Sequence, residues 1–244
     1  MKGNQFARDN AKSSEAAPDS FAAEAEEAFR QFVIRPEFPC LGAKAAFHSG
    51  ASILRTYGEL GSSEATSELS ADLGDFTRSE LRHASEYATF VAIFHGPQNL
   101  DELQFEELLW QQLGAVHRGD AALFDWDPSV RSDPVDPHFS FSFAGQALYV
   151  IGMHANSSRE ARRFRWPTLV FNPHEQFVRL REEGKWNRMQ ETIRTRDREL
   201  QGTINPMLSE FGETSEARQY SGRVVQEDWR APFKAVERKC PFAH

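Results

Sequence analysis

Two apolar runs separated by a two-residue turn constrain the fold more than any other feature of the sequence. The runs cover residues 139–143 and 146–153, and Ala144-Gly145 lies between them. A two-residue connection that contains glycine is typical of a β-hairpin. The chain is therefore expected to contain an antiparallel sheet, because parallel strands need a much longer connection.

Further strands and amphipathic helices are predicted around this hairpin. The runs 87–95 and 168–171 are apolar, with β-branched and aromatic residues, and predict strands. Five helices are predicted. The first covers residues 20–32 and is capped by Ser20, the second covers residues 41–57 and ends before Gly58, and the third covers residues 64–84. The fourth is capped by Asn99, and the fifth covers residues 186–201. Residues 125–138 contain three prolines, and residues 205–244 contain several Gly and Pro, so both are expected to be mostly irregular. The mixture predicts a single α+β domain with helices packed on a mainly antiparallel sheet.

Composition bounds the size and class of the protein. The chain has 244 residues, of which 40% are hydrophobic, and this is enough for one well-packed core. Residues 1–20 are polar and are expected to be a disordered extension, so the domain would cover residues 21–244. The 20 phenylalanines either fill the core or line a large apolar pocket.

Charge and cysteine content argue against several classes of partner. The net charge of −8 disfavours nucleic acid, which binds basic surfaces. No run approaches the roughly 20 apolar residues that span a bilayer, and the first residues lack the apolar run of a signal peptide. The two cysteines, Cys40 and Cys240, do not make a disulfide framework. A cytoplasmic protein with reduced thiols is expected.

The first group of chemically active residues follows the second strand of the hairpin. His154 ends that strand, where it is either a ligand or acid/base group or is hydrogen-bonded in a turn. A helix is expected to begin near Ser157, and on it Arg159 and Arg163 would share one face as an anion clamp. Alternatively, these arginines and Arg162 form a solvated surface.

Three more groups of polar residues follow. Asn172 is expected to cap a helix with Pro173 at its first position, which places His174 in the first turn as a metal ligand or a surface residue. The other two groups are residues 193–206, with Arg196 and Asp197, and residues 215–223, with Glu216, Tyr220 and Arg223. Such density of polar side chains fits a ligand site, but residue types alone do not name the ligand.

These segments together resemble the YqcI/YcgG family over about residues 25–242. The resemblance rests on the following segments: Phe38-Pro39-Cys40-Leu41-Gly42-Ala43, residues 105–110, residues 139–142, Gly152-Met153-His154 through Arg159, residues 170–177, residues 194–197, residues 201–206, Gln219-Tyr220-Ser221-Gly222-Arg223 and Lys239-Cys240-Pro241-Phe242. Family members often end in Trp-x-Cys-Pro-Phe. In this chain, residues 229–233 have Ala231 in place of that cysteine, which leaves the role of Cys240 open.

The resemblance implies a haem b enzyme that uses dioxygen and an external electron donor to hydroxylate a guanidine-like or amine nitrogen of a small molecule. The axial ligand would be His174 or His154, with Cys240 as the alternative. At least one of Arg159, Arg162 and Arg163 would contact a haem propionate or an anionic group of the substrate, with Arg159 and Arg163 preferred. Arg223 would also contact the haem, and Arg196, Asp197, Glu216 and Tyr220 would serve the substrate. Two other functions fit the same residues. One is a non-catalytic haem or small-ligand binding protein, and the other is a non-haem metalloenzyme that uses both histidines and a carboxylate.

Overall fold

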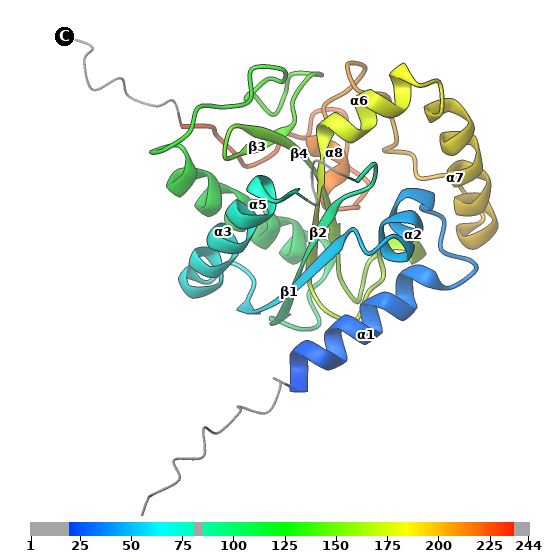
Figure 1. Cartoon of the computed structure of the whole chain (residues 1–244), viewed down its shortest axis with the longest axis horizontal. Helices are drawn as coiled ribbons and strands as arrows, with labels where there is room; N and C mark the ends of the chain where they lie inside the picture. The colour runs from blue at the N-terminus through cyan, green and yellow to red at the C-terminus, as the bar shows by residue number, and fades with distance from the viewer. Residues whose placement is uncertain (1–19, 81–84, 237–244) are drawn as a thin grey trace, which may run out of the picture.

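The structure is a computed structural model, and it describes residues 20–80 and 85–236. Its elements (Figure 1) are, in chain order, α1 (Ser20–Ile34), α2 (Leu41–His48), β1 (Ser52–Glu59), α3 (Ser63–Arg78), β2 (Thr89–Gly96), α5 (Glu102–Asp120), β3 (Phe141–Phe143), β4 (Gln146–Met153), the 3₁₀ turn η1 (Glu160–Arg162), β5 (Thr168–Pro173), α6 (His174–Glu182), α7 (Trp186–Gln201) and α8 (Ala217–Tyr220). The fold is α+β, as the sequence predicts. Ser20 is the first residue of α1, so the predicted extension lies, apart from Ser20, outside the described residues.

One five-stranded sheet organises the fold, with strand order β1-β2-β5-β4-β3. β1 and β2 are parallel, and the other neighbouring pairs are antiparallel. The predicted hairpin is confirmed as β3 and β4, and Ala144 and Gly145 have φ values of 51° and 70°. Positive φ at both central residues is what a tight hairpin turn requires. The sheet is therefore mixed but mainly antiparallel.

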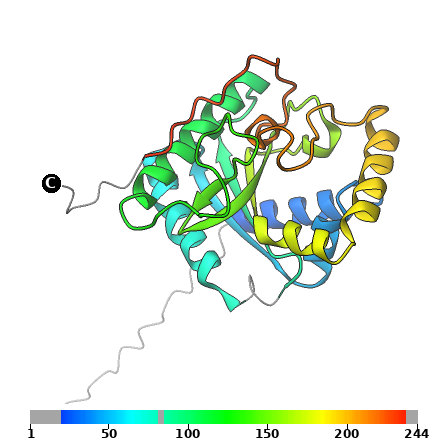
Figure 2. The same ribbon diagram turned by 90° about the horizontal axis from the view of Figure 1, so that it is seen from above.

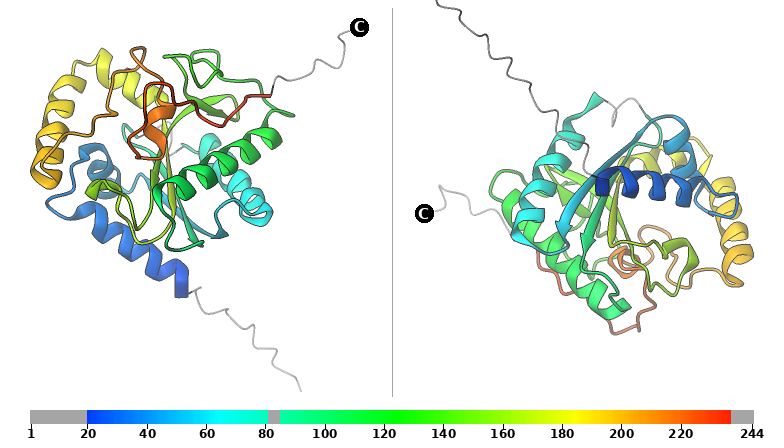
Figure 3. Two further views of the ribbon diagram at one scale, coloured as in Figure 1. Left: turned by 180° about the vertical axis from the view of Figure 1, so that it is seen from behind. Right: turned by 90° about the horizontal axis from the view of Figure 1, so that it is seen from below.

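The two faces of the sheet carry separate apolar layers. On one face, Leu148 and Val150 of β4 join a core with residues of α3 and α5. On the other face, Ile151 and Met153 contact a second core that includes residues of α1. Figure 2 shows α3 and α5 on one side of the sheet and α1, α6 and α7 on the other. In Figure 3 the C-terminal segment runs along α5, consistent with the contact of Phe233 with Trp110.

The predicted helix over residues 41–57 is wrong in its second half. α2 ends at His48, Gly50 has φ of 69°, and residues 52–59 form β1. β1 pairs with β2 from Ser52 through Glu59, and this pairing is made with residues far along the chain. Long-range strand pairing therefore decides the structure of this segment, although the spacing of its apolar residues is typical of a helix.

The helix after β2 is confirmed, but its cap is Asp101 and not Asn99. The Asp101 side chain accepts the backbone N–H of Gln104, and the Gln104 side chain accepts the backbone N–H of Asp101. This reciprocal pair is a capping box. Asn99 lies in the preceding turn with φ of 60°.

Gly152 is the position in β4 where the sheet and α5 pack most tightly. A Cβ atom added there would lie 2.7 Å from side-chain atoms of Leu109 and Phe105 and 2.8 Å from the carbonyl oxygen of Tyr220. Gly152→Ala is expected to lower the free energy of unfolding by about 1–3 kcal/mol, because overpacking forces these groups apart. Urea denaturation measures this change in the free energy of unfolding. Gly58→Ala in β1 is the control, since no atom lies within 4 Å of its added Cβ, and equal losses in both variants would contradict the packing explanation.

Candidate functional site

A cavity lies between the sheet and the helices α1, α2, α6 and α7. Its volume is about 260 Å³, close to the lower end of the roughly 300–1,000 Å³ that is typical of ligand pockets. Side chains from all four helices and from β2, β4 and β5 line it, and most of them are apolar. The lining of the cavity therefore favours a mostly apolar ligand.

Strand alternation decides which side chains reach the cavity. Tyr149, Ile151 and Met153 of β4 line the cavity, whereas Leu148 and Val150, which alternate with them along the strand, pack in the core on the opposite face. Successive strand residues point to opposite faces of a sheet, so this division follows from the strand geometry. The sheet thus provides a floor that is aromatic at one end and aliphatic toward the other.

Helix α7 forms the wall of the cavity that faces the sheet. Trp186, Met189, Ile193 and Asp197 line the cavity at intervals of three or four residues, which places them on one face of the helix. Gly184 before the helix and Gly202 after it both have positive φ, of 68° and 80°. Glycine at these two positions lets the chain turn sharply into and out of this wall.

His174 lies inside the cavity wall at the start of α6. It is 5% exposed, and its Nε2 atom has no hydrogen-bond partner among the described residues. Its ring centroid lies 4.5 Å from that of Phe211, and its Nε2 atom lies 3.5 Å from Glu216 Oε1. A buried ring nitrogen without a partner is costly, so this atom is available for a ligand.

The local structure before His174 differs from the prediction. β5 continues through Pro173, which itself occupies the N-cap position of α6 without a side-chain hydrogen bond. Asn172 is therefore a strand residue and not a cap, and its side-chain amide donates to the carbonyl of Tyr149. Pairing of β5 with β4 extends to Pro173 and decides this boundary. His174 remains in the first turn, as predicted.

Glu216 and Tyr220 lie close together but have different exposure to the cavity. Glu216 is 5% exposed and lines the cavity. Tyr220 is fully buried, and its hydroxyl accepts the backbone N–H of Phe141 at 3.0 Å and donates to Glu216 Oε2 at 3.3 Å. Burial raises the pKa of Tyr220 well above its ordinary value. Tyr220 therefore positions Glu216 and is not among the residues that line the cavity.

Arg159 and Asp197 form a buried ion pair in the cavity wall. Arg159 Nη2 lies 2.6 Å from Asp197 Oδ2, and the same oxygen accepts the backbone N–H of Asn205. Arg159 also donates to the hydroxyl and the carbonyl of Thr203. The two side chains neutralise each other's charge, and their ion pair connects the segment before η1 to α7. Arg196, one residue earlier on α7, is partly exposed and is not among the residues that line the cavity.

The predicted helix from Ser157 with an Arg159–Arg163 clamp is wrong. The segment forms only the 3₁₀ turn η1, with Arg159 before it and Arg163 after it. Arg163 pairs with Glu160 at 2.5 Å, is exposed and is not among the residues that line the cavity. The turn is too short to align residues four apart. Arg162 reaches the cavity instead.

His154 and Arg223 lie away from the cavity. His154 is buried and stacks on Phe105 at 4.5 Å, on the α5 side of the sheet, and burial lowers its pKa. Arg223 pairs with Glu106 of α5 at 2.6 Å. Glu106 also accepts hydrogen bonds from Ser221 and Trp229. Both predicted haem-binding residues therefore hold the fold together on that side.

Cys40 is a cavity residue that the sequence did not single out as a ligand. It is the N-cap of α2, and its Sγ atom accepts the backbone N–H of Ala43. Burial raises the pKa of its thiol. The sequence feature that could have pointed to Cys40 is its position directly before a helix, in the Phe38-Pro39-Cys40 segment. Cys240, the predicted alternative ligand, lies outside the described residues.

The comparisons with known proteins identify the family of the chain. A family model described as the YqcI/YcgG family matches residues 29–234. The chain belongs to the YqcI/YcgG family. No curated protein and no solved structure matched the chain. The YqcI/YcgG match covers all of the cavity residues named above.

Two further observations concern metal and membrane. Within residues 20–80 and 85–236 of this YqcI/YcgG protein, no three His, Cys, Asp or Glu side chains are grouped as metal ligands would be. In the same part of the chain, no helix combines the length and apolar character needed to cross a bilayer. His154 and His174 do not face a common space, so the predicted facial arrangement of both histidines with a carboxylate does not occur.

Proposed function

We propose that this protein binds haem b in the cavity and uses dioxygen to hydroxylate a nitrogen of a small guanidine or amine. The observation that carries the proposal is the buried Nε2 of His174, which makes no hydrogen bond, in the wall of a mostly apolar cavity. A haem site needs an apolar slot and one axial ligand, usually a histidine or a cysteine thiolate. Membership of the YqcI/YcgG family supports the same proposal.

The axial ligand that we favour is His174. Its Nε2 atom lacks a partner, whereas the Sγ atom of Cys40 already accepts an N–H and its raised pKa disfavours the thiolate. Apolar side chains such as Ile151, Val170 and Leu180 would enclose the ring. When bound, haem supplies the dioxygen chemistry, with electrons from an external donor.

Glu216 is the residue that we expect to hold the cationic nitrogen group of the substrate. It is a buried carboxylate in the cavity wall, and among the described residues it has no arginine or lysine partner. Asp197 was an equal candidate from the sequence, but its carboxylate already pairs with Arg159 and accepts the backbone N–H of Asn205. A buried carboxylate is stabilised by a cation with N–H donors. We also include a cytoplasmic location in the proposal, because two cysteines do not make the disulfide framework typical of secreted proteins.

An absorption spectrum of protein purified from haem-supplemented cells tests the proposal first. A Soret band is expected, and its absence after supplementation would overturn haem binding. The second step supplies reductant, dioxygen and a panel of guanidines and amines, and measures products one oxygen atom heavier by mass spectrometry. A Soret band without turnover of any compound would favour a haem-binding protein that is not an enzyme.

A further inference from the structure

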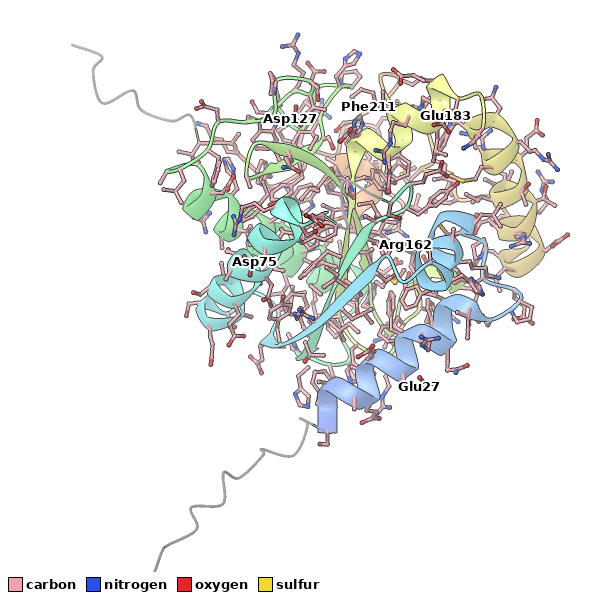
Figure 4. The ribbon with its side chains drawn as sticks, viewed as in Figure 1. Glu27, Asp75, Asp127, Arg162, Glu183 and Phe211 are labelled. Atoms are coloured by element: carbon pink, nitrogen blue, oxygen red, sulfur yellow. The ribbon has the colours of Figure 1, made fainter. Side chains whose placement is uncertain are left out.

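We propose that Arg162 is the anchor for a carboxylate group of a ligand in the cavity. The side chain is 9% exposed and lines the cavity near α2. Its position is labelled in Figure 4. Two sources of the carboxylate fit the same chemistry: a haem propionate or a carboxylate of the substrate. The first source rests on the proposed binding of haem, and the second rests on the proposed class of substrate but not on haem.

Backbone carbonyls hold the Arg162 guanidinium in place and leave one edge free. Nη1 donates to the carbonyls of Gly152 and Tyr220 at 3.0 and 3.3 Å, and Nη2 donates to the carbonyl of Gln219 at 3.2 Å. These bonds leave the Nε hydrogen and one Nη2 hydrogen without a partner among the described residues. These two hydrogens are on neighbouring nitrogens of the guanidinium, which can donate together to the two oxygens of a carboxylate.

Arg162 differs from its neighbours in lacking a carboxylate partner. Arg159 pairs with Asp197 at 2.6 Å, and Arg163 pairs with Glu160 at 2.5 Å. Among the ion pairs of the described residues, none includes Arg162. A buried charge is costly unless a counter-charge lies nearby, so a fixed cation in a ligand cavity favours an anionic ligand.

The groups around Arg162 do not supply that counter-charge. After burial, Tyr149 and Cys40 have the largest influence on the pKa of Arg162, and burial raises the pKa of both of these groups. Near neutral pH the phenol and the thiol are therefore uncharged. Asp197 also acts on Arg162, but its charge is matched by Arg159. Burial accordingly lowers the pKa of Arg162 from its ordinary value.

The local backbone is shaped around this side chain. Gly222 has φ of 83°, and a Cβ added there would lie 3.4 Å from Arg162 Cγ. Glycine therefore allows the segment after α8 to pass close to the stem of Arg162 while the carbonyls of Gln219 and Tyr220 bind its head. The arrangement fixes the direction of the free edge before any ligand binds.

The test compares ligands with and without the carboxylate on wild-type protein, Arg162→Gln and Arg162→Lys. For haem, the pair is haemin and its dimethyl ester, titrated into haem-free protein by the Soret band. For the substrate, the pair is 3-guanidinopropionate and propylguanidine, titrated by calorimetry into haem-loaded and haem-free protein. Arg163→Gln is the matched control, because Arg163 is adjacent in sequence but outside the cavity.

We expect wild-type protein to prefer the carboxylate form of one pair by roughly 10- to 100-fold. Arg162→Gln should abolish that preference, Arg162→Lys should retain part of it, and Arg163→Gln should retain all of it. A preference only within the haem pair identifies a propionate, and one only within the guanidine pair identifies a substrate carboxylate.

A wild-type protein that prefers neither carboxylate form overturns the inference, and this result does not depend on how the variants fold. A preference that survives in folded Arg162→Gln also overturns it. Should neither haemin nor its ester bind, the proposed function fails, and calorimetry on haem-free protein still decides the role of Arg162.

Discussion

Replacement of His174 by alanine is expected to lower haem affinity by more than about 100-fold. Loss of a partner that only supports a metal ligand costs about 10- to 100-fold, so loss of the ligand itself should cost more. The unpartnered Nε2 of His174 is the ligand atom in the proposed site. Titration of haem into haem-free protein, followed by the Soret band, measures the change. The carbon monoxide adduct of the ferrous wild-type protein should absorb at the position typical of histidine ligation.

Two variants control this experiment. His154→Gln alters the other histidine that the sequence proposed, which lies against Phe105 away from the cavity, so haem affinity should stay within about threefold. Cys40→Ser tests the thiol that lines the cavity. A carbon monoxide adduct shifted far to the red in wild type, and lost in Cys40→Ser, would show that the ligand is the thiolate and that His174 has another role.

Glu106→Ala is expected to lower the free energy of unfolding by about 3–5 kcal/mol. Glu106 is 6% exposed and accepts hydrogen bonds from Arg223, Ser221 and Trp229, so it joins the C-terminal segment to α5. Removing one partner of a buried ion pair leaves the other without compensation, which costs about this much. For a chain of this size the melting temperature should fall by roughly 6–20 °C.

Glu107→Ala is the matched control for Glu106, since Glu107 is the next residue on α5 and is exposed. Its free energy of unfolding should change by less than about 0.5 kcal/mol. Chemical denaturation of both variants, followed by circular dichroism, gives the comparison. A loss below 1 kcal/mol in Glu106→Ala would mean that the C-terminal segment contributes little to the stability of the domain.

Secondary structure was predictable wherever the signal is local. The β3–β4 hairpin follows from its own turn, and α7 follows from a polar helical stretch between two glycines. Residues 52–57 of β1 were assigned to a helix because their pairing partner, β2, lies more than thirty residues away. Asn172 was assigned to a cap for the same reason, since its pairing with Tyr149 is not visible in its neighbours.

The sequence predicted which types of residue form the site, but it did not predict which individual residues line the cavity. The sequence pointed to His174, Arg159, Asp197 and Glu216, which line the cavity. It pointed equally to His154, Arg223 and Tyr220, whose surroundings lie outside the cavity wall. Cys40 and Arg162 also line the cavity, although the sequence did not single out Cys40 and favoured Arg159 and Arg163 over Arg162. Each is polar and close to a predicted element, and nothing in its immediate sequence shows which way it points.

The sequence by itself determined the α+β class, the hairpin and the family, because these depend on local periodicity, turn residues and the order of short motifs. Only the tertiary structure decided which face of the sheet each polar residue reaches. That choice depends on strand register, and a shift of one residue sends a side chain to the opposite face. His154 and Met153 are adjacent in the chain, yet Met153 lines the cavity and His154 packs on Phe105. Register is set by pairing between β4 and β5, whose residues are separated by the whole arginine-rich segment.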